Sequence, residues 1–90
     1  MRVTFDPVKN ARNIAERDLP FEKVADLAWE TAILQEDRRK DYGETRVRVL
    51  ARLGRRLHVA VITMRGEAMH VISFRKANRK EVEWYEQEKG

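Results

Sequence analysis

The apolar positions along the chain recur with two different periods, and the change falls at about residue 31. Before this point they recur at helical spacing, as over residues 7–17. After it, apolar and polar residues alternate, most clearly over residues 45–53. Alternation with period two is typical of strands, so the chain is expected to place helices near its start and a sheet in its second half.

Residues that begin or end helices set the boundaries of the predicted elements. Asp6-Pro7 supplies an N-cap and a first-turn proline, Pro20 ends the first helix, and Asn78 with Glu81 forms a capping pair. The pattern predicts strands over residues 2–5, 31–35, 45–53, 57–64 and 68–74, and helices over residues 7–17, 21–30 and 79–89. This order predicts an α+β domain: an antiparallel β-sheet meander with two N-terminal helices and a C-terminal helix.

Both predicted N-terminal helices are amphipathic and are expected to cover a sheet. Their apolar positions are Val8, Ala11, Ile14 and Ala15 in the first, and Phe21, Val24, Ala25, Ala28 and Trp29 in the second.

Composition limits the class of protein. Ninety residues fit one domain, residues 1–90, with one small core. No stretch approaches the roughly 18 apolar residues of a membrane span, and the first residues contain no secretory signal, so a cytoplasmic protein without a membrane partner is expected. The absence of cysteine excludes thiol catalysis and Cys-ligated metals.

The net charge of +4 is unevenly distributed. Residues 1–45 carry a net charge of −2, whereas residues 46–90 carry +6, mostly through arginine. This asymmetry favours a surface in the C-terminal half that faces a polyanion, although a solvated basic face without a partner fits the charge equally well.

Few residues remain for catalysis. No glycine-rich phosphate loop is present, and neither His58 nor His70 has metal-ligand spacing with another histidine. Glu36, Asp37 and Asp41 lie close enough in sequence to bind Mg²⁺, but surface ion pairs with the basic residues between them explain the same pattern. The prediction is that no metal or other cofactor is needed.

Arginines can bind phosphate and stabilise the charge of a phosphorane, and RNA supplies its own nucleophile, the 2′-hydroxyl. Arg46 and Arg48 lie on one strand face, while Arg75 and Arg79 flank the junction between the last strand and the last helix. Tyr85 on that helix is a candidate acid or base, and packing in the core is an equally good interpretation of it.

Several motifs resemble the BrnT family of toxins. They are Phe5-Asp6-Pro7-x-Lys9, Glu36-Asp37-Arg38-x-x-Asp41-Tyr42-Gly43-Glu44-x-Arg46, and Ile72-Ser73-x-Arg75-Lys76-Ala77-x-Arg79-x-Glu81. The similarity covers nearly the whole chain. One departure lies between the first two helices, where the family usually has Lys-His-Gly and this chain has Glu16-Arg17-Asp18. Without the glycine, a different turn is expected there.

The resemblance implies a RelE-like fold and a metal-independent endoribonuclease that cleaves RNA and inhibits translation. It also implies neutralisation by a BrnA-like antitoxin, through which the complex would contact operator DNA indirectly. It assigns Arg75, Arg79 and Tyr85 to catalysis, and Arg46, Lys76 and Tyr42 to substrate binding. The strand-face pattern adds Arg48 to the expected substrate-binding residues. Two other functions remain open: a non-catalytic nucleic-acid binder, and a protein-interaction module.

Overall fold

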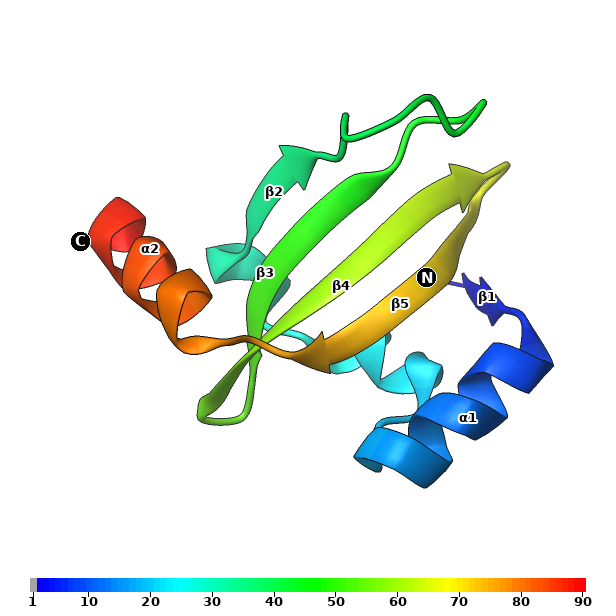
Figure 1. Ribbon diagram of the computed structural model, residues 1–90, viewed down its shortest axis with the longest axis horizontal. Coiled ribbons are helices and arrows are strands. Elements are labelled where there is room, and N and C mark those ends of the chain that lie inside the picture. Colours follow the sequence, from blue (N-terminus) through cyan, green and yellow to red (C-terminus); the bar gives the residue numbers. More distant parts are fainter. Residues whose placement is uncertain (1) are drawn as a thin grey trace.

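The chain forms a five-stranded sheet with helical segments on both faces and at one edge (Figure 1). A computed structural model describes residues 2–90. The strands are β1 (Arg2–Phe5), β2 (Ile33–Glu36), β3 (Val47–Leu53), β4 (Arg56–Arg65) and β5 (Ala68–Lys76). The helices are α1 (Pro7–Arg17), α2 (Arg79–Lys89) and two short 3-10 helices, η1 (Phe21–Asp26) and η2 (Trp29–Thr31). None of these helices is long and apolar enough to span a bilayer.

The sheet is mixed, which corrects the prediction of a purely antiparallel one. Strands β2 to β5 form the expected meander, each antiparallel to the next. Strand β1 lies at the opposite edge from β2 and runs parallel to β5. The physical reason is the long crossover between β1 and β2, which takes the chain across the sheet and leaves β1 beside the last strand. Pairing at this separation along the chain has no local signal.

The helix predicted over residues 21–30 is instead the pair η1 and η2. Phe21, Val24 and Leu27 are all buried, and their spacing of three matches the three residues per turn of a 3-10 helix. At Leu27 the backbone becomes extended, and the Ala28 N–H then donates to the Arg52 carbonyl at 2.8 Å. This hydrogen bond to the end of β3 interrupts the helix, so a tertiary contact overrides the helical pattern.

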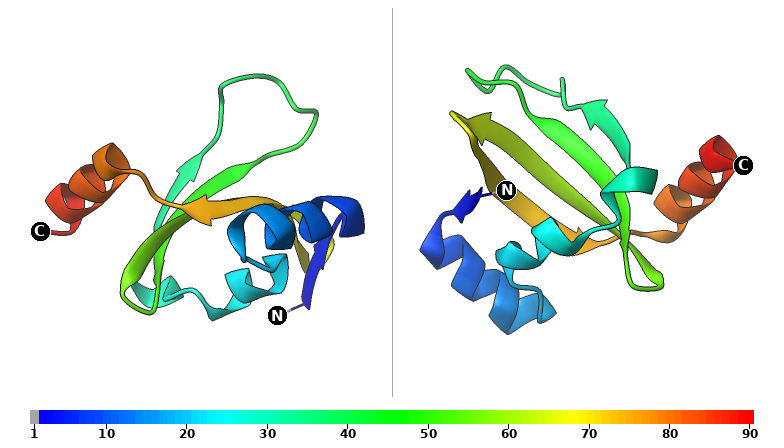
Figure 2. Two further views of the ribbon diagram at one scale, coloured as in Figure 1. Left: turned by 60° about the horizontal axis from the view of Figure 1, so that its bottom comes forward. Right: turned by 180° about the vertical axis from the view of Figure 1, so that it is seen from behind.

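Helix α1 has the predicted boundaries but the opposite orientation. Its apolar stripe faces solvent, with Val8 68% and Ile14 41% exposed. The side facing the protein carries two asparagines: Asn13 donates to the Phe74 carbonyl at 3.0 Å, and Asn10 accepts from the first N–H of η1. The helix lies beside β1 and β5 rather than across the sheet (Figure 2). Its inward side therefore forms hydrogen bonds with backbone groups instead of burying apolar side chains.

The turn after α1 keeps the geometry of a glycine turn. Asp18 adopts a left-handed conformation with φ 56°, and its N–H donates to the Ile14 carbonyl. The left-handed turn forms without a glycine because aspartate tolerates this region of φ/ψ space at modest cost.

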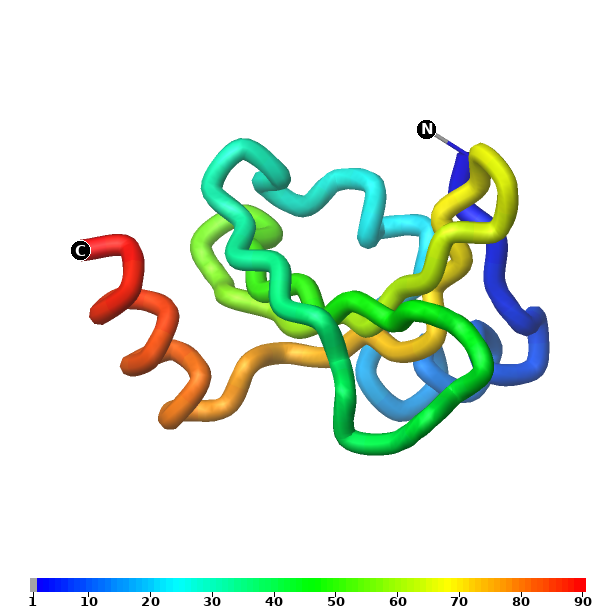
Figure 3. The backbone as a smooth tube through the Cα atoms, turned by 90° about the horizontal axis from the view of Figure 1, so that it is seen from above, coloured from blue at the N-terminus to red at the C-terminus, as the bar shows by residue number. Residues whose placement is uncertain are grey.

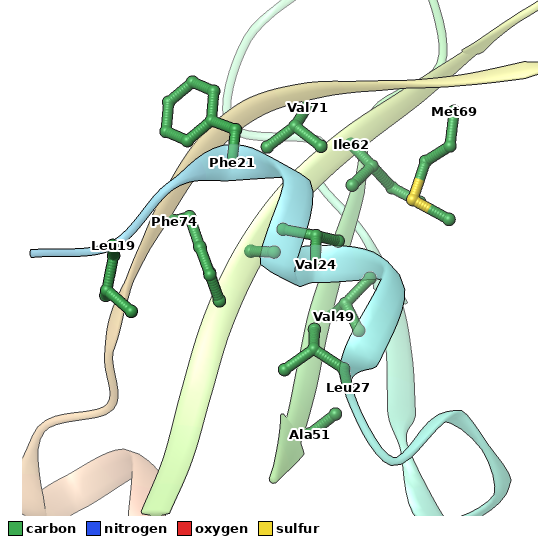
Figure 4. Packing of buried hydrophobic residues seen from close by; sticks show 11 residues of the cluster. Leu19, Phe21, Val24, Leu27, Val49, Ala51, Ile62, Met69, Val71 and Phe74 are labelled. Atoms are coloured by element: carbon green, nitrogen blue, oxygen red, sulfur yellow. The ribbon is translucent and has the colours of Figure 1, made fainter. Parts of the chain in front are cut away.

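The two faces of the sheet bury separate clusters of apolar residues. We call the face covered by η1 and η2 the back face, where Leu19, Phe21, Val24 and Leu27 pack against strand residues such as Val49 (Figure 4). The other face, the front face, is covered at one end by α2, with Tyr85 packed against Leu50, Leu57 and Val59. Figure 3 shows the loop of residues 37–46 on the opposite side of the sheet from η1 and η2.

A β-bulge in β5 decides which residues of that strand face α2. Val71 pairs with Ile62 and Ser73 pairs with Val61, so Ile72 is an extra residue with no partner on β4. The extra residue reverses the alternation, and both Val71 and Phe74 therefore pack in the back cluster. As a result Arg75 lies on the front face.

Candidate functional site

The start of α2 is fixed by the predicted capping pair. The Asn78 side chain accepts from the Glu81 N–H at 2.9 Å, and the Glu81 carboxylate accepts from the Asn78 N–H at 2.8 Å. This reciprocal arrangement confirms the expected capping box. It also holds the Glu81 carboxylate in place above the front face.

Glu81 binds two arginines as well as its own helix cap. Arg75 donates from both terminal nitrogens to the two carboxylate oxygens, at 2.8 and 2.9 Å. Arg48 of β3 donates to Oε2 at 2.8 Å and also contacts Gln35 of β2. The Glu81 side chain is only 11% exposed, so four charge-assisted or backbone hydrogen bonds converge on a nearly buried carboxylate.

These contacts determine the charge state of Glu81. The hydrogen bond from Arg75 is the largest cause and lowers the Glu81 pKa to about 2, against the opposing effect of burial. The carboxylate is therefore ionised at neutral pH. Because a general base works best with a pKa near the working pH, Glu81 is suited to holding arginines rather than to accepting protons.

The loop of residues 37–46 brings a third arginine to the same place. The Asp37 N–H donates to the Arg46 carbonyl at 2.8 Å, which closes the loop. Arg39 then donates to both oxygens of the Asp37 carboxylate, at 2.9 and 2.8 Å. The hydrogen bond from Arg39 holds the Asp37 pKa well below its usual range.

Four arginines line one groove of about 350 Å³ on the front face, between α2 and this loop: Arg38, which pairs with Glu36, and Arg39, Arg48 and Arg75. We call Arg39, Arg48 and Arg75, with Asp37 and Glu81, the front cluster. Each guanidinium has five N–H donors, more than its carboxylate partner occupies. The groove can therefore accept an anion while the carboxylates keep the arginines oriented.

Tyr42 and Arg46 contact each other in the same loop. The Arg46 guanidinium lies 4.0 Å from the centre of the Tyr42 ring and pairs with Glu44 at 3.2 Å. The Tyr42 hydroxyl donates to Asp37 at 3.3 Å. These two predicted binding residues lie next to the front cluster and are linked to it through Asp37.

Tyr85 lies away from the groove. It is 4% exposed, and its hydroxyl donates to the Thr31 carbonyl at 2.8 Å. Its ring packs in the front apolar cluster, so its visible role is to attach α2 to the sheet.

Arg79 and Lys76 are also outside the front cluster. The Arg79 side chain is 92% exposed and pairs with Glu83 one turn further along α2. Lys76 is exposed and lines a neighbouring groove of about 700 Å³ together with Arg17, Arg75 and Asn78. The structure thus brings Arg48 and Arg75 together and separates Arg79 from them.

The histidines belong to the sheet. His58 lies on the back face, opposite to Val59, and packs against Phe74. His70 contacts the Thr4 hydroxyl at 2.9 Å. Burial lowers the pKa of both rings.

The carboxylates considered for Mg²⁺ do not converge. Asp37 is engaged by Arg39, and Asp41 accepts from the Gly43 N–H. Within residues 2–90, no three acidic or histidine side chains gather in the way a metal site requires.

Two members of the front cluster escaped the sequence analysis. Glu81 was named as a helix cap and as part of a family motif but not as a site residue, and Arg39 was not singled out. The bidentate contact between Arg75 and Glu81 depends on the β-bulge at Ile72, and no local sequence pattern predicts this bulge.

The sheet of this small α+β fold presents carboxylate-held arginines in an open groove, an arrangement whose charge and geometry suit a phosphate group. The family model described as the ribonuclease toxin BrnT of type II toxin–antitoxin systems matches residues 5–81. The chain therefore belongs to the BrnT family of ribonuclease toxins, as its motifs predicted. A comparison with curated proteins found no significant match.

Proposed function

We propose that this chain is a metal-independent endoribonuclease that cleaves RNA in the groove of the front cluster and thereby inhibits translation. The observation that carries the proposal is the convergence of Arg39, Arg48 and Arg75 on one groove, with Asp37 and Glu81 fixing their geometry. Guanidinium groups held in this way provide preorganised positive charge where negative charge develops on a reacting phosphate.

The chemistry follows from what RNA itself contributes. The 2′-oxygen forms a bond to the adjacent phosphorus while the bond to the 5′-oxygen of the next nucleotide breaks. The 2′-hydroxyl proton leaves to a base, the departing 5′-oxygen gains a proton, and a 2′,3′-cyclic phosphate and a 5′-hydroxyl are formed. In this mechanism Arg48 and Arg75 bind the non-bridging oxygens, and Arg39 closes the groove from the loop side.

The remaining predicted residues fit supporting roles in this proposal. Arg46 and Tyr42 hold the loop that carries Arg39, and Tyr85 holds α2 and hence Glu81. Lys76 and Arg79 are exposed cations beside the groove, where they would contact flanking nucleotides.

The decisive experiment is incubation of purified protein with RNA in the presence of a chelator. We expect cleavage with cyclic phosphate ends, and we expect Arg75→Ala and Arg48→Ala to lower the rate by about two to three decades. Arg2→Ala removes an exposed arginine of β1 and is the matched control. Binding of RNA without cleavage would overturn the proposal in favour of a non-catalytic nucleic-acid binder.

The antitoxin partner of this family is proposed to be a BrnA-like protein with a DNA-binding domain, so that the complex represses its own operon. The family assignment supports the existence of an antitoxin. Expression of the chain alone in a cytoplasm is expected to arrest growth, and co-expression of the neighbouring gene's product is expected to restore it. Growth that is unaffected by expression alone would favour an interaction module without catalysis.

A further inference from the structure

A second group of arginines lies at the hairpin between β3 and β4, outside the front cluster. Arg52, Arg55 and Arg56 surround this turn, and Arg79 faces them from the first turn of α2. Together they line a groove of about 460 Å³, and we call these four residues the hairpin cluster. The groove's other charged residue is Glu86.

The contacts of the hairpin cluster differ in kind from those of the front cluster. Arg52 donates to the Arg55 carbonyl and Arg56 to the Ala77 carbonyl, both at 3.3 Å. Within residues 2–90, none of the three hairpin arginines lies within 4 Å of a carboxylate oxygen. Arg79 alone is paired, with Glu83. Backbone carbonyls therefore orient two of these side chains while leaving their charge uncompensated.

The two clusters are joined by the segment between β5 and α2. Asn78 lines the hairpin groove and also the groove that contains Arg75 and Lys76. Arg75 in turn lines the groove of the front cluster. Arg75 and Lys76, with the neutral Asn78, thus connect the groove of the front cluster to that of the hairpin. They lie where β5 leads into α2 (Figure 1).

We propose that the hairpin cluster binds the phosphodiester backbone of the RNA segment that flanks the cleaved bond. The inference rests on the proposed function, because it takes the front cluster as the place of cleavage. Continuity with that site favours RNA over an acidic protein segment, since one strand can occupy both grooves. Uncompensated arginines suit this role, because the phosphate backbone contributes affinity through release of its counterions.

The test compares a long and a short substrate. The double variant Arg55→Gln/Arg56→Gln removes two charges, and glutamine at position 56 still carries an N–H donor for the Ala77 carbonyl. Arg2→Gln/Lys23→Gln removes the same charge from exposed positions on β1 and η1, away from both grooves.

For an RNA of about 20 nucleotides, the hairpin variant is expected to raise KM about tenfold and to reduce the slope of log affinity against log salt by about 1.4. Its cleavage of a dinucleotide, which cannot reach the hairpin, should equal that of the wild type. The control variant should change none of these values by as much. Equal effects on both substrates, or an unchanged salt slope, would overturn the assignment.

Failure of the proposed function can be distinguished from failure of this inference. If the wild type does not cut RNA, its affinity for the same RNA oligonucleotide can still be measured directly by fluorescence anisotropy. Loss of that affinity in the hairpin variant supports the binding site alone. A variant that binds RNA normally but binds the antitoxin weakly would overturn the proposal and assign the hairpin to an acidic protein segment.

Discussion

The front cluster and the hairpin cluster are both rich in arginine, yet they differ in whether carboxylates accompany the arginines. In the front cluster, Arg39 and Arg75 each bind both oxygens of a carboxylate, and their positions are fixed before any ligand arrives. At the hairpin, Arg55 and Arg56 have no such partner within residues 2–90.

The difference teaches how one residue type can serve two purposes. A paired arginine contributes little net charge at a distance, but its geometry suits stabilisation of a transition state. An unpaired arginine contributes attraction and salt-dependent affinity, with little geometric control. The arginines of residues 46–90 therefore do not form one uniform surface. Arg48 and Arg75 are paired with Glu81, and Arg46 and Arg65 with Glu44, whereas the hairpin arginines lack a carboxylate within the described residues 2–90.

The largest expected effect is a difference in kcat between variants of the front cluster and variants of the hairpin cluster. Arg75→Ala should lower kcat by about two to three decades, whereas Arg55→Ala should leave kcat nearly unchanged and raise KM only for long RNA. Single-turnover cleavage at saturating RNA measures this difference. Equal losses of kcat in the two variants would show that the distinction between the clusters is wrong.

The next effect tests the carboxylate that defines the front cluster. Glu81→Gln can keep the capping hydrogen bond, because glutamine also serves at this position, but it removes the charge that holds Arg48 and Arg75. We expect kcat to fall by about tenfold or more through misplacement of the two arginines. Glu83→Gln, which alters an exposed carboxylate of the same helix, is the control.

Glu81 also predicts a dependence of stability on pH. Its pKa is lowered from 4.5 to about 2 in the folded chain, so its contribution to the free energy of unfolding is present above pH 4.5 and is lost as the pH falls toward 2. After allowance for solvent screening of the half-exposed Arg75, this contribution is on the order of 2 kcal/mol. Urea unfolding between pH 5 and 2 should show a smaller loss for Glu81→Gln than for the wild type; parallel curves would contradict the assignment.

Tyr85→Phe separates packing from catalysis. Removing the hydroxyl takes away the hydrogen bond to the Thr31 carbonyl, and we expect a loss of about 1 kcal/mol in the free energy of unfolding with cleavage nearly unchanged. Thermal unfolding and cleavage rates on the same preparation provide the measurement. A large loss of kcat with unchanged stability would return Tyr85 to a catalytic role.

The smallest effect concerns the turn after α1, which lines the groove that also contains Arg75, Lys76 and Asn78. Asp18→Gly relieves a positive φ and should stabilise the fold by up to about 1 kcal/mol without affecting cleavage. Chemical denaturation measures the gain. A destabilised variant would mean that the side chain of Asp18 contributes more than its backbone conformation costs.

The sequence alone determined the local elements, because their signals lie within a few residues of each other. Alternation identified β3, a largely apolar run identified β4, and the Asn78–Glu81 spacing identified the start of α2. The motifs around Asp41–Gly43 and Arg75–Ala77 identified the family. Arg48 and Arg75 were among the candidate residues named from the sequence, and both bind Glu81; their role with RNA stays a prediction.

Only the tertiary structure decided how these elements combine. The parallel position of β1, the outward stripe of α1 and the break between η1 and η2 all arise from contacts between segments far apart in the chain. The bulge at Ile72 places Arg75 on the front face, where Glu81 orients it beside Arg48. Local patterns fix hydrogen bonds along a segment, but the pairing of charges across strands depends on register and on the face each strand presents.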